Sequence, residues 1–180
     1  MPSLPFHDDK HFVISMMAAV DIDEIIKLTR LNPTNVVRTV PLPSVQRRAG
    51  PILLHPKNDK AEGILSLIGT PVGCANEAEM KPMVSMTGHI SSFYELMRVT
   101  QDWCIKEGVA PDAARLYVSS FYSSLSQATQ LTTDSLEHMC EEAITPGGLN
   151  EQSMKYMRST DHYTIQASSL QQILNRLQGK

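Results

Sequence analysis

The 180 residues carry 42% apolar and 19% charged side chains, which is enough apolar material for a buried core and excludes a disordered chain. Lys and Arg number 16, Asp and Glu number 19, and the formal net charge is -3. Arg47 and Arg48 form the one adjacent basic pair. Binding to nucleic acid or to an anionic membrane surface is therefore not expected.

The first apolar run, residues 12–20, is interrupted only by Ser15. It is much shorter than the ~20 residues of a transmembrane helix. Asp8 and Asp9 precede it where a signal peptide would carry basic residues, so we expect a buried strand here.

Three cysteines, Cys74, Cys104 and Cys140, are spread widely along the chain. Their odd number and wide spacing fit neither a disulfide framework nor a zinc site, which indicates a reducing, cytoplasmic location. The ten methionines are typical of an adaptable core or interface, and no metal site is expected.

From the N-terminus to residue 78, short apolar runs alternate with short amphipathic segments. The runs are FVISMMA, NVVRTV, GPILLH and TPVGCA, and the amphipathic segments between them are IDEIIKLTR and AEGILSLIG. This alternation predicts an α/β domain over residues 1–78, with a mostly parallel sheet covered by helices. Asp21 and Glu24 are spaced as a capping box for the first helix.

The connection between the second and third predicted strands, PLPSVQRRAGP, holds three prolines and a glycine, so an irregular loop that lines a site is expected there. Arg38 lies in the second strand, and we expect it to make a structural ion pair, although pairing with a phosphate is an alternative. His89 and His138 have no partner at catalytic spacing.

Residues 79–180 follow a helical period throughout. A stripe begins after Pro111 and contains Ala113, Leu116, Tyr117, Ser120, Phe121, Ser124, Leu125 and Ala128. Two shorter stripes are Leu136, Met139, Cys140 and Ala143, then Leu170, Ile173, Leu174 and Leu177. A long helix is expected from Lys81 to Glu107, and Thr145–Gly148 should break the chain sharply between helices.

These stripes have few residues of the same chain to pack against. We therefore expect a homodimer formed through the helical domain, with a higher oligomer left open, because such apolar surface needs a second copy to cover it. A monomeric bundle packed on the α/β part is the alternative.

Four segments of the sequence, taken in order, suggest a family. VISMMAAV, VVRTVP, VSMTGHISSFYELM and AITPGGLNEQ are similar in order and spacing to segments of the pyrroline-5-carboxylate reductase family, from Phe12 onward. The resemblance implies a Rossmann-like α/β part followed by an all-α dimerisation domain. It also implies reduction of a cyclic imine to a proline-like product with NADP or NAD as the cofactor.

The resemblance also implies roles for individual residues. Met16, Met17, Ala18 and Pro41 match positions that lie against the cofactor. Thr87, Thr145, Gly147, Gly148 and Asn150 match positions that bind the substrate, and Asn150 stands where the family places a threonine that hydrogen-bonds the substrate ring nitrogen.

Two adjacent glycines at the start of a helix can expose backbone N–H groups to a substrate carboxylate. Asn150 can add its side-chain amide as a donor. The alternative is that Thr145–Gly148 is only a turn that stops a helix.

No G-x-G-x-x-G motif occurs in the sequence, so the Rossmann-like sheet is expected to be incomplete and dinucleotide binding by these residues weak. Ala19, Leu42, Ile90 and Ser91 also depart from the family pattern. The second hypothesis is therefore a non-catalytic dimerisation or regulatory relative without the cofactor half.

Overall fold

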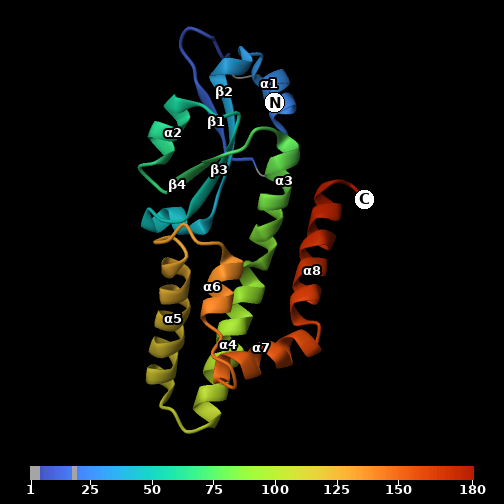
Figure 1. The fold of residues 1–180 in the computed structure, drawn as a ribbon. Coiled ribbons are helices and arrows are strands. Elements are labelled where there is room, and N and C mark those ends of the chain that lie inside the picture. The colour runs from blue at the N-terminus through green and yellow to red at the C-terminus, as the bar shows by residue number, and fades with distance from the viewer. Residues whose placement is uncertain (1–4, 18–19) are drawn as a thin grey trace. The chain divides into compact units, whose positions relative to one another are not determined.

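The computed structural model describes residues 5–17 and 20–180 (Figure 1). The chain forms two compact units, Met1–Thr87 with Ile173–Lys180, and Gly88–Gln172. The first contains a sheet and the second is helical, so the predicted fold class is confirmed. The division between the units falls inside the last helix, and the predicted boundary between residues 78 and 79 stays a prediction.

A four-stranded sheet in the order β1-β2-β3-β4 forms the centre of the first unit. Its strands are β1 (Val13–Ser15), β2 (Val36–Pro41), β3 (Pro51–His55) and β4 (Thr70–Gly73). The outer pairs are parallel, as expected, but the central pair β2–β3 is antiparallel. The reason is the connection between them, which contains only a 3-10 helix at Pro43–Arg47 and returns the chain directly to the neighbouring strand.

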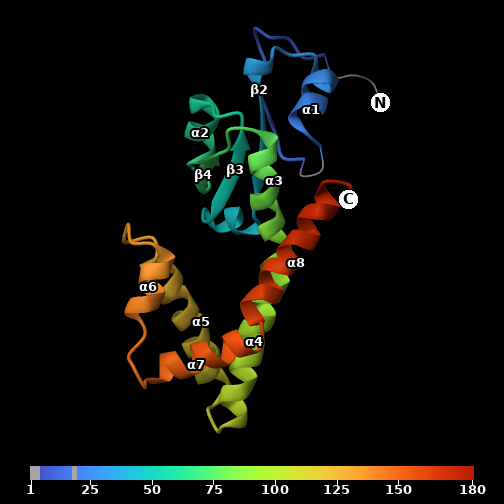
Figure 2. The same cartoon turned by 45° about the vertical axis from the view of Figure 1, so that its right-hand side comes forward.

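Helices cover both faces of this sheet. Helices α1 (Ile22–Thr29) and α3 (Glu77–Ser85) lie on one face, and α2 (Asp59–Leu65) lies on the other (Figures 1 and 2). Three clusters of buried side chains join these layers. They are Val37, Ile52, Leu54, Ala61 and Leu65 under α2; Val40, Leu53, Cys74, Met80 and Val84 under α3; and Ile22, Ile25, Leu31 and Val36 under α1.

The first strand is shorter than predicted. Ser15 is the last residue of β1 and lies opposite Arg38 of β2. Met16 and Met17, predicted to continue the strand, are 55% and 53% exposed. The Met17 N–H instead donates to the Ser15 hydroxyl at 3.4 Å, and the Met17 carbonyl accepts from the Val20 N–H. The sheet pairing therefore ends at Ser15, although the apolar run continues beyond it.

The predicted capping box of α1 does not form. Asp21 occupies the N-cap position, but its side chain makes no capping hydrogen bond. The free N–H of Ile22 donates instead to Oε1 of Glu77, at 2.9 Å. A carboxylate from α3 thus supplies the cap that the sequence pattern assigned to a residue within α1.

The second unit contains α4 (Ile90–Lys106), α5 (Pro111–Ala128), α6 (Leu136–Glu142), α7 (Leu149–Ser159) and most of α8 (His162–Leu177). Helices α4 and α5 pack against each other. All residues of this unit are described, and among them only Ala114 and Val118 are buried. In the described part of the chain no helix combines the length and the apolar character of a membrane span.

The predicted long helix from Lys81 to Glu107 is interrupted. A 3-10 turn at Met86–His89 separates α3 from α4. Next to it, the hydroxyls of Ser85 and Thr87 donate to the carbonyls of Lys81 and Val84, at 3.0 and 2.8 Å. Hydroxyl groups that bond to nearby carbonyls compete with regular helical geometry, which explains the break.

Substitution of Leu65 tests the packing of the core under α2. It is 1% exposed, whereas Leu67, two residues later, is 71% exposed. We expect Leu65→Ala to lower the free energy of unfolding by ~2–5 kcal/mol, because it leaves a cavity in a packed core. Leu67→Ala should change it by less than about 0.5 kcal/mol. Urea denaturation of both variants measures the difference, and equal effects would contradict this description of the core.

Candidate functional site

The loop Thr145–Gly148 separates α6 from α7, so the predicted break is confirmed. Gly147 adopts a left-handed conformation with φ of 74°, which favours glycine. The Gly148 N–H donates to the Thr145 carbonyl at 2.8 Å and closes the turn. A Cβ on Gly148 would lie 2.9 Å from that same carbonyl oxygen, so both glycines are needed for this backbone path.

Three donors of this region, the Gly147 and Gly148 N–H groups and the Asn150 side-chain amide, are hydrogen-bonded to neighbours in the chain. The Gly147 N–H donates to Oε2 of Glu151 at 2.8 Å, and Oε1 of Glu151 lies 2.8 Å from Nζ of Lys155. The side-chain amide of Asn150 donates to the Ala143 carbonyl at 2.8 Å. Hydrogen bonds from Lys155 and from the Gly147 N–H hold the pKa of the Glu151 carboxyl below its usual range. The Gly147 N–H of the loop therefore binds a carboxylate in the structure, namely that of Glu151 in α7.

The residues predicted to bind substrate fall into two groups. Thr145, Gly147, Gly148 and Asn150 lie together at the surface of the second unit. Thr87 belongs to the first unit, where its hydroxyl donates to the Val84 carbonyl. Their roles toward a substrate, and that of Asn150 in catalysis, stay predictions.

The residues predicted to contact the cofactor lie at the carboxyl ends of the parallel strands β1 and β2. Met16 and Met17 directly follow β1, and Pro41 is the last residue of β2. Ala18 lies outside the described residues. The carboxyl ends of parallel strands are where open α/β sheets bind their ligands, which makes this edge a candidate site.

This edge fits one part of a nicotinamide dinucleotide. The exposed thioether chains of Met16 and Met17 offer an apolar surface that suits an aromatic ring. The phosphates fit less well, because the first N–H of α1 is bonded to Glu77 and Asp21 lies beside it. The described residues thus suit the nicotinamide ring and provide no glycine-rich turn for the pyrophosphate.

Arg38 makes the structural ion pair expected for it. Its guanidinium is buried, pairs with Oε2 of Glu77 and lies 3.7 Å from Oδ1 of Asp21. Lys81 Nζ lies 3.5 Å from the other oxygen of Asp21. The prediction of a structural role for this arginine is confirmed.

Two acidic residues at these sites were missed from the sequence. Glu151 is the third residue of α7, which is the position of the acidic member of a capping box, and Lys155 follows it by four. That spacing could have indicated its contact. Glu77 lies 55 residues from Ile22, and no local pattern predicts their hydrogen bond.

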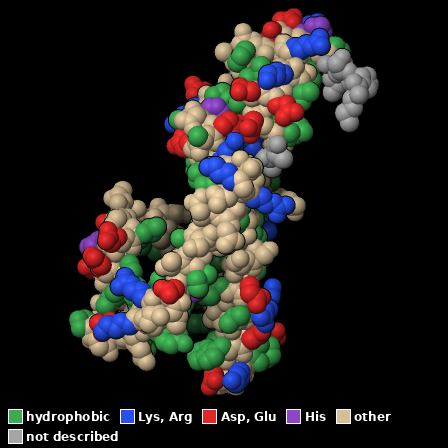
Figure 3. Space-filling model, turned by 90° about the vertical axis from the view of Figure 1, so that its right-hand side faces the viewer, with side chains coloured by type: hydrophobic (Ala, Val, Ile, Leu, Met, Phe, Trp, Pro, Cys, Tyr) green, Lys and Arg blue, Asp and Glu red, His purple; other side chains and the backbone are tan. Residues whose placement is uncertain are grey.

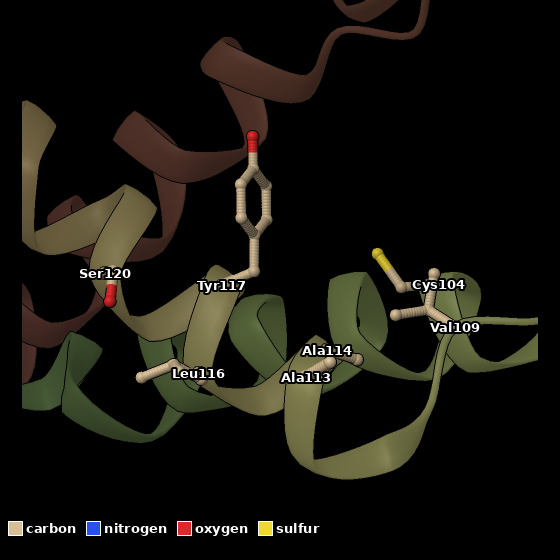
Figure 4. Close-up of a pocket in the computed structure, with 7 residues that line it drawn as sticks. All are labelled: Cys104, Val109, Ala113, Ala114, Leu116, Tyr117 and Ser120. Atoms are coloured by element: carbon tan, nitrogen blue, oxygen red, sulfur yellow. The ribbon is translucent and has the colours of Figure 1, made fainter.

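An apolar hollow of about 540 Å³ lies where the end of α4 and the following turn meet α5. In Figure 4 the Tyr117 ring stands at one side and Cys104 with Val109 at the other, with Ala113 and Ala114 between them. Leu116 and Ser120 complete the lining. Four of the lining residues, Ala113, Leu116, Tyr117 and Ser120, are therefore the first half of the stripe predicted along α5.

The large side chains of the predicted stripe are exposed, including the two that line the hollow. Leu116 and Tyr117 are each 70% exposed, whereas the buried residues of α5, Ala114 and Val118, lie on a different face. Figure 3 shows the face of the molecule on the side of α8, where hydrophobic side chains lie in several separate places on the helical unit. The stripe is thus a real apolar surface without a partner inside its own unit.

A comparison with protein-family models and with curated protein sequences finds no match. Solved structures do match. The pyrroline-5-carboxylate reductase of Coxiella burnetii superposes with a TM-score of 0.80 at 21% identity, covering 93% of this chain and 65% of the other. The Plasmodium falciparum pyrroline carboxylate reductase with NADP bound gives 0.79 at 12% identity, covering 96% of this chain and 72% of the other.

The 1-pyrroline-5-carboxylate reductase of Streptococcus pyogenes gives 0.78 at 12% identity, covering 96% of this chain and 70% of the other. The chain thus spans about two thirds of the length of the first of these proteins and slightly more of the other two. Nearly all of it, sheet and helices together, has the fold of the pyrroline-5-carboxylate reductases.

Proposed function

We propose that the chain belongs to an NAD(P)H-dependent imine reductase of the pyrroline-5-carboxylate reductase type. The observation that carries this proposal is the fold similarity, with TM-scores of 0.78–0.80 over 93–96% of the chain. The glycine turn at the start of α7 supports it further. Because hydride transfer needs no protein nucleophile, the protein's task is to hold the nicotinamide and imine carbons ~3–3.5 Å apart.

In this proposal the loop Thr145–Gly148 binds the carboxylate of a proline-like substrate through backbone N–H groups. Asn150 donates to the ring nitrogen, and Thr87 provides a further hydroxyl. Met16, Met17, Ala18 and Pro41 form the surface for the nicotinamide ring.

We also propose that the protein works as a homodimer through α4 and α5. Ten large apolar side chains on residues 90–128 are at least 41% exposed: Phe93, Tyr94, Leu96, Val99, Trp103, Val109, Leu116, Tyr117, Phe121 and Leu125. Side chains of this size, about half exposed, present on the order of 1,000 Å² of apolar surface. A stable interface buries ~800 Å² per partner, so the surface is large enough for one.

The three unpaired cysteines support a reducing, cytoplasmic setting for this enzyme.

A second candidate function is a non-catalytic dimeric scaffold. One observation favours it: the Gly147 N–H and the Asn150 amide, the donors that a substrate would use, are bonded to Glu151 and to the Ala143 carbonyl. A scaffold would keep these bonds permanently, whereas an enzyme would exchange them for substrate.

Substitution of Leu116 tests the proposed dimer. We expect wild-type protein to be a dimer by light scattering at micromolar concentration. Leu116→Lys should shift it toward monomer and lower its melting temperature, because a charge would enter an apolar interface. Leu67→Lys, at an equally exposed leucine of the first unit, is the matched control and should remain dimeric. A wild-type monomer that unfolds cooperatively would contradict the proposal.

Substrate binding is tested by NMR shift mapping with proline as the product ligand. We expect shifts to cluster at residues 145–150. Asn150→Leu should weaken binding by a few-fold to about tenfold, because one hydrogen bond of ~0.5–1.5 kcal/mol is lost. Gln152→Leu, two residues further along α7, is the control. Saturating proline that leaves residues 145–150 unshifted would favour the scaffold.

Activity is tested by the oxidation of NADPH with 1-pyrroline-5-carboxylate, followed by absorbance. The proposal expects turnover that requires both reactants, that falls in Asn150→Leu and that needs roughly millimolar NADPH, because these residues provide no glycine-rich turn for the pyrophosphate. The proposed reductase activity would be contradicted if folded, dimeric protein oxidised no NADPH with this or a related cyclic imine.

A further inference from the structure

Glu151 holds its carboxylate between two partners at the start of α7. Oε2 accepts the hydrogen bond from the Gly147 N–H at 2.8 Å, and Oε1 lies 2.8 Å from Nζ of Lys155, about one helical turn further on. The bonds from Lys155 and from the Gly147 N–H hold the pKa of this carboxyl below its usual range, so it is charged at neutral pH. An anion of the chain itself therefore occupies a donor that the proposed function assigns to the substrate carboxylate.

The hydrogen bond at Gly147 is easier to exchange than the one at Gly148. The Gly148 N–H donates to the backbone carbonyl of Thr145, which is part of the same turn. The Gly147 N–H donates to the end of a side chain, which leaves by rotation about its own single bonds. Gly147 is exposed in the second unit, so small ligands reach this residue from solvent. The Gly147 N–H is therefore the donor of the turn that a ligand carboxylate can take over.

Lys155 keeps the Glu151 carboxylate paired during such an exchange. Leaving an anion without a partner costs free energy, but Oε1 retains Nζ of Lys155 when Oε2 leaves the Gly147 N–H. Glu followed by Lys four residues later is the favoured order for an ion pair along a helix. The Lys155 side chain is 72% exposed and that of Glu151 is 28% exposed, so water replaces the donor that Oε2 gives up.

Resting on the proposed function, we propose that Glu151 is an internal competitor of the substrate carboxylate. It occupies the Gly147 N–H in the free protein, and the substrate displaces it onto Lys155 alone. The apparent affinity for a ligand falls with the fraction of protein that is open to it, so this contact lowers the affinity of the loop for a carboxylate. Glu151 thereby sets the substrate concentration at which the loop fills.

Glu151→Gln tests the competition, because it keeps the length of the side chain and removes its charge. A hydrogen bond to a neutral amide oxygen is weaker than one to a carboxylate, so the Gly147 N–H is released more readily. Glu137→Gln is the matched control, because it removes the same charge from an exposed position in the first turn of α6.

The experiment is an NMR titration of the full chain with cyclopentanecarboxylate, followed at residues 145–150. This probe carries a carboxylate on a five-membered ring without a ring nitrogen, so Asn150 has no ring nitrogen to bind. We expect the Kd of the probe to fall about threefold to tenfold in Glu151→Gln and to change less than about twofold in Glu137→Gln. Cyclopentanecarboxamide, which has the same shape and no charge, should show no such gain in Glu151→Gln.

The amide proton signal of Gly147 separates direct competition from simple charge repulsion. Competition predicts that this signal moves upfield in free Glu151→Gln, because its hydrogen bond is weaker, and that the probe returns it toward its wild-type position. Repulsion at a distance predicts no such movement at Gly147. A tighter Kd without it would overturn the inference.

A double-mutant comparison shows whether Lys155 acts through Glu151. Lys155→Met should raise the Kd of the probe by about twofold to fivefold in wild type, because the displaced carboxylate loses its second partner. In the Glu151→Gln background the same change should matter less than about twofold. An equal effect in both backgrounds would mean that Lys155 attracts the ligand directly, which overturns the proposed exchange.

The outcomes distinguish this inference from the proposed function. If residues 145–150 respond to neither proline nor the probe, even in Glu151→Gln, the placement of the substrate carboxylate falls and the role of Glu151 falls with it. If wild type binds the probe at residues 145–150 and Glu151→Gln binds it no more tightly, the role of Glu151 alone is overturned.

Discussion

Between helices α4 and α5 only the small side chains of Ala114 and Val118 are buried, and the ring contact between Phe93 and Tyr122 leaves Phe93 46% exposed. Ordering a chain costs conformational entropy that burial of apolar surface has to offset. Within residues 88–172 that burial is almost absent, and the proposed dimer would supply it by covering the α5 stripe. The loop Thr145–Gly148 belongs to the same unit, so in this proposal its order depends on the same cover.

The first unit is organised differently. Three buried clusters join its sheet to α1, α2 and α3, so its stability comes from its own residues. Among the residues of this unit that the structure describes, Arg38 is the one buried charge, and Glu77 compensates it through an ion pair that links β2 to α3. The edge of the sheet proposed to meet a cofactor thus belongs to a unit with its own buried core, and the loop proposed to meet a substrate belongs to a unit with little buried apolar surface.

The sequence predicted most of the elements because their signals are local. The strands at Val36–Pro41 and Pro51–His55 are continuous apolar runs, and the stripe after Pro111 has a clear helical period. The predictions fail where contacts between residues far apart in the sequence determine the local structure. Met16 and Met17 look like strand residues, yet the strand ends at Ser15, and α1 is capped by Glu77 from far along the chain. The contact of Glu151 with the loop was not predicted, although Glu151 is the third residue of α7, the position of the acidic member of a capping box.

A crystal structure of the protein grown with proline and NADPH tests the account most directly. We expect a second copy of the chain packed on the stripe that contains Leu116 and Tyr117. We also expect the proline carboxylate on the Gly147 and Gly148 N–H groups, with the Glu151 carboxylate moved away from Gly147. A single copy with the stripe open to solvent, and Glu151 still bonded to Gly147 in the presence of proline, would contradict the account.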